Sequence, residues 1–160
     1  MKRLIAVAAL AGVAGVLLAG NSGGNEPATK PVASQAGPAG KAGPLPAWVH
    51  RRFIPFGVKR KHQMARYSKR HYGKREWRLK NPKQIVQHVA VASSALAVRR
   101  HFASNRPDPE FGERPNVCAH FVISGRGRIY QLVRLGIRCR HTVGLNHVSI
   151  GIEHTGFRDG

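Results

Sequence analysis

The chain has 160 residues, enough for one compact domain and too few for two of ordinary size. It carries 27 Lys and Arg against 7 Asp and Glu, a formal net charge of +20, which predicts anionic surroundings or an anionic partner without identifying the polyanion. The two cysteines, Cys118 and Cys139, are too few for a disulfide-based fold, and they form either a single bridge or two separate buried thiols.

The first 24 residues have the pattern of a secretory signal peptide. Two basic residues precede an apolar run from Leu4 to Ala19, and small polar residues follow it. This run is shorter than the roughly 20 residues that a membrane-spanning helix needs, so an uncleaved anchor is the alternative. Asn21 stands where a lipoprotein processing site would have Cys, so no lipid anchor is expected. The pattern therefore predicts an exported protein, secreted or associated with the cell wall.

Residues 25–47 consist mainly of Pro, Ala, Gly, Ser and Lys, which is typical of a flexible linker. A folded domain is therefore expected over residues 48–160. Its first part, residues 51–80, is a basic block in which Glu76 is the only acidic residue. This block is either a solvated face or a binding surface for a polyanion. In an exported chain, an anionic cell-wall polymer or a membrane surface is more accessible than nucleic acid.

Two helices and a strand are predicted in the first half of this domain. Residues 57–72 contain no Pro and have a narrow apolar stripe, which indicates a helix ending at Gly73. Residues 84–91 form a β-branched run about one strand long. Ser93 and Ser94 then offer good N-cap side chains for a second helix that ends at Ala103.

The second half of the domain predicts a hairpin and a final strand. Residues 118–123 and 128–133 are strand-like and are joined by a turn-forming segment, residues 124–127. Residues 147–154 alternate apolar residues on one face with Ser149, Gly151 and Glu153 on the other. Strand, helix, hairpin and strand in this order predict an α/β domain with a mixed β-sheet flanked by helices.

Histidines and one isolated carboxylate are the candidate chemical groups. The chain has nine His but neither a nucleotide-binding glycine loop nor the paired-His helix of metalloproteases. His88, His120 and His154 fall on predicted strands, where the alternative to a ligand is an ordinary core histidine. Glu153 is the only carboxylate between Arg114 and Arg158, and burying it is costly unless a cation or metal is near. A His/Glu metal site is therefore one hypothesis.

Three motifs in order resemble the zinc-dependent N-acetylmuramoyl-L-alanine amidase family, which includes the bacteriophage lysozyme-type amidases and the peptidoglycan recognition proteins. They are a strand ending in His at residues 85–88, a hairpin at residues 119–133, and a loop with a Glu-bearing strand at residues 141–154. The lead-in at residues 52–57 is similar to that of exported actinobacterial members. Together the motifs extend over about half of the chain.

The resemblance implies hydrolysis of the amide bond between N-acetylmuramic acid and L-alanine of peptidoglycan, with Zn²⁺ as cofactor. It implies that His88 is a zinc ligand and that Glu153 is the catalytic carboxylate. It places His141 and Asn146 in the muropeptide-binding groove, although a loop in which the Asn supports a turn is an equal alternative. His120 is a further candidate beside the substrate, and its alternative is a strand residue that supports the site.

The chain departs from the family pattern at several positions. Val89 and Ala90 follow the first His where the family has an aromatic or polar residue and then Thr or Ser, and the hairpin turn has Ser124 and Arg126 in place of acidic residues. The family takes its remaining zinc ligands from a segment beyond the Glu strand, so we expect a domain that is incomplete at its C-terminus. The alternatives are a zinc-free module that binds peptidoglycan, or a basic polyanion-binding protein acting through residues 51–80.

Overall fold

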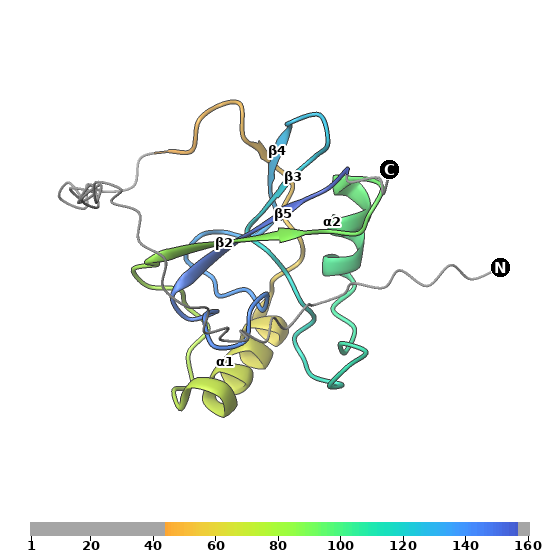
Figure 1. Ribbon diagram of the computed structural model, residues 1–160. Coiled ribbons are helices and arrows are strands. Elements are labelled where there is room, and N and C mark those ends of the chain that lie inside the picture. The colour runs from red at the N-terminus through yellow and green to blue at the C-terminus, as the bar shows by residue number, and fades with distance from the viewer. Residues whose placement is uncertain (1–43, 157–160) are drawn as a thin grey trace, which may run out of the picture. The chain divides into compact units, whose positions relative to one another are not determined.

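The computed structural model describes residues 44–156 (Figure 1). The predicted signal peptide and all but the end of the predicted linker lie outside these residues. The elements are β1 (His50–Arg51), α1 (Val58–Tyr72), β2 (Gln84–Val89), α2 (Ala95–Ala103), β3 (Phe121–Ile123), β4 (Ile129–Gln131) and β5 (Ser149–His154).

Both predicted helices are present, and their ends have clear local causes. Helix α1 ends where Gly73 adopts a left-handed conformation with φ 72°, and the Gly73 N–H donates to Lys69 O. Helix α2 begins after Ser94, whose side chain accepts a hydrogen bond from the Ala97 N–H. The predicted boundaries of these two helices are therefore confirmed to within one residue.

The five strands form one mixed sheet in the order β1-β4-β3-β5-β2. Strands β3 and β4 pair antiparallel as the predicted hairpin, while the β1–β4, β3–β5 and β5–β2 pairs are parallel. The predicted α/β class with a mixed sheet is thus confirmed. The strands are shorter than expected, and the two-residue strand β1 had no signal in the sequence.

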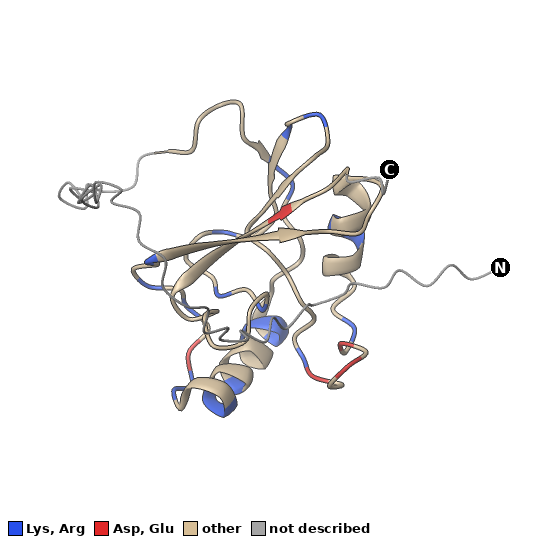
Figure 2. Cartoon of the chain, in the orientation of Figure 1, with Lys and Arg blue, Asp and Glu red and all other residues tan. Residues whose placement is uncertain are grey.

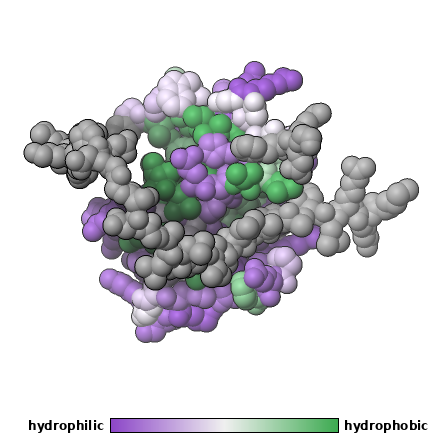
Figure 3. All heavy atoms as spheres, viewed as in Figure 1, coloured by the Kyte–Doolittle hydropathy of each residue, from purple (hydrophilic) through white to green (hydrophobic). Residues whose placement is uncertain are grey.

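The core lies between the sheet and helix α2. Val98 and Phe102 of α2 are buried in the same cluster as Val122 of β3. On the opposite face of β2, the side chains of Ile85 and Val89 are 65% and 57% exposed. Figure 3 shows apolar residues at the surface in the middle of this view. Among the described residues, no helix is both long and apolar enough to cross a bilayer.

The two cysteines are free thiols inside this core. Cys118 and Cys139 are both fully buried, and the Cys118 N–H donates to Arg140 O at 2.9 Å. Burial raises the pKa of the Cys139 thiol. Of the two alternatives left open by the sequence, the structure has the separate thiols.

Candidate active site

The parallel pairing of β2 with β5 brings His88 and Glu153 side by side. These two residues are register partners, so their side chains leave adjacent strands on the same face of the sheet. Val122 is the partner of Glu153 on the other side, and it lies in the core beneath α2. The face is therefore the one covered by α2. Alternation along residues 147–154 predicted that Glu153 faces away from Ile150 and Ile152, which is confirmed, but the core lies on the Glu153 face and not on the apolar face of this strand.

Glu153 lies in surroundings that disfavour its charge. Its carboxylate borders a small pocket whose other lining residues are mostly apolar: Ala90, Val91, Ala92, Ala97, Val98, His101 and Phe102. Burial raises the pKa of Glu153 to about 7. A carboxyl group that titrates near neutral pH can both accept and return a proton, which suits general acid–base chemistry.

His141 contacts His88 and has a defined tautomer. The Ser149 hydroxyl donates to Leu145 O at 2.7 Å, so its 3.4 Å contact with His141 Nε2 requires this nitrogen to carry the proton. His141 Nδ1 is then an acceptor, 3.2 Å from His88 Nε2 and 3.1 Å from Thr142 Oγ1. Burial, together with the neighbouring His120 and His88, lowers the pKa of His141 to about 3. Burial also lowers the pKa of His88. Both imidazoles are therefore neutral at pH 7.

His120 supports the site from inside the core. It is fully buried, its Nε2–H donates to Ile137 O at 2.9 Å, and its Nδ1 accepts from the Gly151 N–H at 3.0 Å. Burial lowers its pKa to about 4. With both ring nitrogens bonded to the backbone, His120 has no free polar atom for a substrate. Its position corresponds to the supporting alternative rather than to substrate binding.

Asn146 is likewise buried and acts within the loop. Its Oδ1 accepts hydrogen bonds from the backbone N–H groups of His141 and Thr142, both at 2.8 Å. Its Nδ2 donates to the hydroxyls of Tyr72 at 2.9 Å and Tyr67 at 3.3 Å. Asn146 therefore fixes the loop that presents His141 and ties this loop to α1. Full burial of Asn146 favours the turn-supporting alternative over contact with a substrate.

Gly151 provides the space that the His141 ring occupies. A Cβ atom at this position would come within 2.7 Å of Cγ of His141 and within 2.9 Å of two other ring atoms. We expect Gly151→Ala to displace the ring and to lower the free energy of unfolding by about 1–3 kcal/mol, as overpacking does. Urea unfolding, with NMR of the His141 ring, measures both effects.

Gly136→Ala is the matched control, because a Cβ atom at Gly136 would have no other atom within 4 Å and the φ of this residue is not positive. Equal stability of the two variants, with unchanged His141 resonances, would show that the close contact at Gly151 does not hold the ring.

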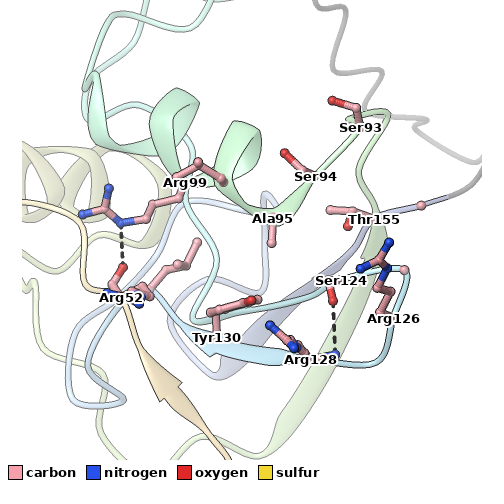
Figure 4. A pocket seen from close by; sticks show the side chains of 14 residues that line it. Arg52, Ser93, Ser94, Ala95, Arg99, Ser124, Arg126, Arg128, Tyr130 and Thr155 are labelled. Atoms are coloured by element: carbon pink, nitrogen blue, oxygen red, sulfur yellow. Dashed lines mark hydrogen bonds between the residues drawn. The ribbon is translucent and has the colours of Figure 1, made fainter.

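A cleft lined by arginines lies beyond the end of β5, and His88, His141 and Glu153 are not among its lining residues. Figure 4 shows Arg52, Arg99, Arg126 and Arg128 around it, with Tyr130 on strand β4 of the hairpin. The cleft has a volume of about 930 Å³ and is reached two residues beyond Glu153 along the chain, since Thr155 also lines it. Its lining includes no Asp or Glu. Guanidinium groups that have no carboxylate partner in a cleft favour a carboxylate- or phosphate-bearing ligand.

The metal-ligating capacity of the described residues is partial. Neutral imidazoles such as His88 and His141 are ordinary zinc donors, but a catalytic zinc site takes three protein ligands. Within residues 44–156, no three His, Cys, Asp or Glu side chains are grouped to hold a metal ion. These residues therefore do not complete a zinc site by themselves.

Several residues of the site were missed from sequence. Thr142 and Ser149 both contact the His141 ring, and Tyr67 and Tyr72 hold Asn146 across a separation of more than 70 residues. Ser149 shares the Glu153 face in the strand alternation, which was an available signal. The tyrosines lie in a basic helix, where the sequence has no feature that indicates a contact with the loop.

The chain is similar to a family of known proteins and to solved structures. The model of a family described as N-acetylmuramoyl-L-alanine amidase matches residues 78–159, more than half of the chain. Among solved structures, the chain is similar to the N-acetylmuramoyl-L-alanine amidase LysC from Clostridium intestinale URNW, with 25% identity, a TM-score of 0.38 and 48% of each chain covered. It is also similar to a selenomethionine derivative of AmpD, with 22% identity, a TM-score of 0.43, and coverage of 69% of this chain and 62% of that one. The match thus spans less than two thirds of either solved chain. No curated protein matches.

Proposed function

The chain belongs to the N-acetylmuramoyl-L-alanine amidase family, and from this premise we propose that it hydrolyses the amide bond between N-acetylmuramic acid and L-alanine in peptidoglycan. The observation that carries the proposal is the pairing of His88 with Glu153 on adjacent parallel strands. The family motifs meet at this point in space, although the two residues lie far apart in the sequence. Cell-wall degradation or remodelling is the role that follows from this activity.

Glu153 is the proposed proton carrier. With a pKa raised by burial to about 7, its carboxylate accepts a proton from the attacking water and returns it to the departing amine of L-alanine. The neutral His141, oriented by Ser149 and the loop around Asn146, contacts His88 and thereby positions the imidazole of His88. These roles are the ones that the geometry best supports.

The arginine-lined cleft is the proposed binding site of the stem peptide. A stem peptide carries carboxylates, and guanidinium groups pair with carboxylates through two parallel hydrogen bonds. Arg99 is held in place by its bonds to the carbonyl oxygens of Arg52 and Phe53, both at 3.0 Å. It is therefore oriented before the ligand arrives, which lowers the entropy cost of binding.

Among the residues that the structure describes, His88 is the proposed zinc ligand. When bound, Zn²⁺ supplies a Lewis acid that polarises the scissile carbonyl. Because residues 44–156 do not contain a complete group of ligands, a non-catalytic module that binds peptidoglycan is the second candidate function. We further propose export of the chain, on the basis of its N-terminal sequence pattern.

The test is hydrolysis of a soluble muropeptide by the full chain with added Zn²⁺. Mass spectrometry should detect a stem peptide with a free L-alanine amino terminus, and His88→Ala should reduce its release to background. His88→Ala should also weaken zinc binding, measured by competition with a chromophoric chelator. His62→Ala, which removes an exposed imidazole of α1, is the matched control.

The two candidate functions give different results in this experiment. Hydrolysis that persists in His88→Ala would contradict the proposed site. Retained binding to insoluble peptidoglycan without product release would establish the recognition module instead.

A further inference from the structure

Helix α1 presents a line of exposed cations to solvent. Lys59, Arg66 and Lys69 are exposed and are spaced by seven and three residues, so they lie on one side of the helix. Lys74 and Arg75 are exposed in the segment that follows the helix. Figure 2 shows the basic positions along α1. We call these five residues the α1 basic face.

Five of the other seven cations of the basic block have partners within the fold; the exceptions are the exposed Arg51 and Arg52, and Arg52 lines the arginine-lined cleft. Arg60 is buried and donates to the carbonyl oxygens of Phe102 and Asn116. Four more stack on Trp77 or form ion pairs: Lys61 and Arg78 with Trp77, Arg70 with Glu113, and Lys80 with Glu76. By contrast, no residue of the α1 basic face has a carboxylate within 4.0 Å in residues 44–156.

The position of Lys59 is not explained by the stability of the helix. The first turn of α1 contains no acidic residue, although the helix dipole favours negative charge there and disfavours Lys59. Lys69 in the last turn does stabilise the helix, since its Nζ donates to Gly73 O at 2.9 Å. Lys59 therefore opposes the helix dipole at the N-terminus of α1, yet it lies on the same side as Arg66 and Lys69. This arrangement indicates an anionic ligand that extends along the helix.

The surroundings of the α1 basic face select among polyanions. Met64 and Tyr67 of α1 are fully buried, and Val58 alone is an exposed large apolar side chain of this helix, so α1 has no apolar face for insertion into a lipid surface. Helix α1 has no exposed Phe, Tyr or Trp side chain on which a nucleic-acid base would stack; its exposed rings are the imidazoles of His62 and His71. The α1 basic face can therefore recognise a polyanion by its charge alone. Its helical part, from Lys59 to Lys69, is about 15 Å long at a rise of about 1.5 Å per residue.

We propose that the α1 basic face binds a phosphodiester-linked anionic polymer of the cell wall. The choice of a wall polymer rests on the proposed function, because such a polymer lies beside peptidoglycan and would hold the enzyme on its insoluble substrate. Each phosphate contact releases counterions, so this binding weakens as the salt concentration rises.

The test compares two variants of the full chain that lose the same charge. One has Lys59→Gln, Arg66→Gln and Lys74→Gln, and the control has Lys83→Gln, Arg100→Gln and Arg106→Gln at other exposed positions. Poly(glycerol phosphate), a phosphodiester polymer without bases, is the probe, and its Kd is measured between about 50 and 200 mM salt. We expect the first variant to lose about two units of the log Kd–log salt slope, at roughly 0.7 per lost contact, while the control keeps its slope.

Equal loss of slope in the two variants would overturn the proposal, since net charge rather than the α1 basic face would then determine binding. Tighter binding of the wild type to duplex DNA of equal charge would overturn it in favour of nucleic acid. Neither measurement depends on catalysis. Cleavage of a soluble muropeptide is expected to be the same in wild type and both variants, so failure of the polymer proposal is distinct from failure of the amidase proposal.

Discussion

Glu153→Gln is expected to reduce muropeptide hydrolysis by about 10²–10⁴-fold, the usual contribution of a positioned general acid–base group. Gln keeps the size of the side chain and its place in β5 but cannot exchange a proton. The small pocket beneath α2 should therefore remain packed, and the far-UV circular dichroism should remain that of the wild type. Steady-state kinetics with a soluble muropeptide measure the loss.

The same substitution has a signature in stability that does not require activity. Burial raises the pKa of Glu153 from 4.5 to about 7, so between these values the folded protein holds a proton that the unfolded chain releases. The free energy of unfolding of the metal-free protein should therefore fall as the pH rises from 4.5 to about 7. Glu153→Gln should remove this contribution to the slope.

Glu110→Gln is the control for both measurements, because Glu110 is exposed and forms no ion pair in the described residues. A Glu153→Gln variant with wild-type rate and wild-type dependence of stability on pH would exclude Glu153 as the proton carrier. If Glu153→Gln lost activity but kept the wild-type dependence of stability on pH, Glu153 would act in catalysis without the raised pKa that burial gives it.

Asp108→Asn is expected to destabilise the fold by about 3–5 kcal/mol, because it leaves a buried guanidinium group without its hydrogen-bonded carboxylate, with only Glu113 at 3.8 Å as a counter-ion. Asp108 and Arg140 form an ion pair in which each side chain is only 7% exposed. The Asp108 carboxylate also accepts hydrogen bonds from the N–H groups of Phe111 and Glu113, at 2.7 and 3.0 Å. Urea unfolding followed by Trp fluorescence measures the change at constant m.

The direction of the Asp108 pKa supports this expected loss. Burial alone would raise it, but the hydrogen bonds from Arg140 and from the backbone lower the pKa of Asp108 overall. The stabilisation should thus be present at neutral pH and be lost as the pH falls through the folded-state pKa of Asp108. The difference between Asp108→Asn and wild type should shrink in acid. A loss below about 1 kcal/mol at neutral pH, the range of a surface ion pair, would show that the pair is solvated rather than buried.

Local sequence was sufficient for the elements whose cause is local. Gly73 ends α1 because a left-handed backbone suits Gly, and Ser94 begins α2 because its hydroxyl satisfies a free N–H. The hairpin followed from its turn residues. The alternation around Glu153 correctly placed Glu153 and Ile152 on opposite faces of β5, but the core lies on the Glu153 face and not on the apolar one. Strand ends were overestimated, since β-branched runs continue beyond the residues that find a partner.

Residue type alone could not distinguish the roles of the histidines. His88, His120 and His141 have the same side chain, and the sequence offers all three as site residues. Only the tertiary structure shows that both ring nitrogens of His120 are bonded to the backbone, while His141 reaches His88 from a distant loop. Such contacts join chain segments that are far apart in the sequence, so no local pattern encodes them.

The sequence by itself determined the α/β class, the helix boundaries and the motifs that carry the family resemblance, because each depends on propensities and spacing within a few residues. The tertiary structure decided that Asn146 is a buried support of the loop, that Glu153 has a raised pKa, and that four arginines share one cleft. These properties arise from burial and from the summed field of distant groups, which exist only after the chain has folded.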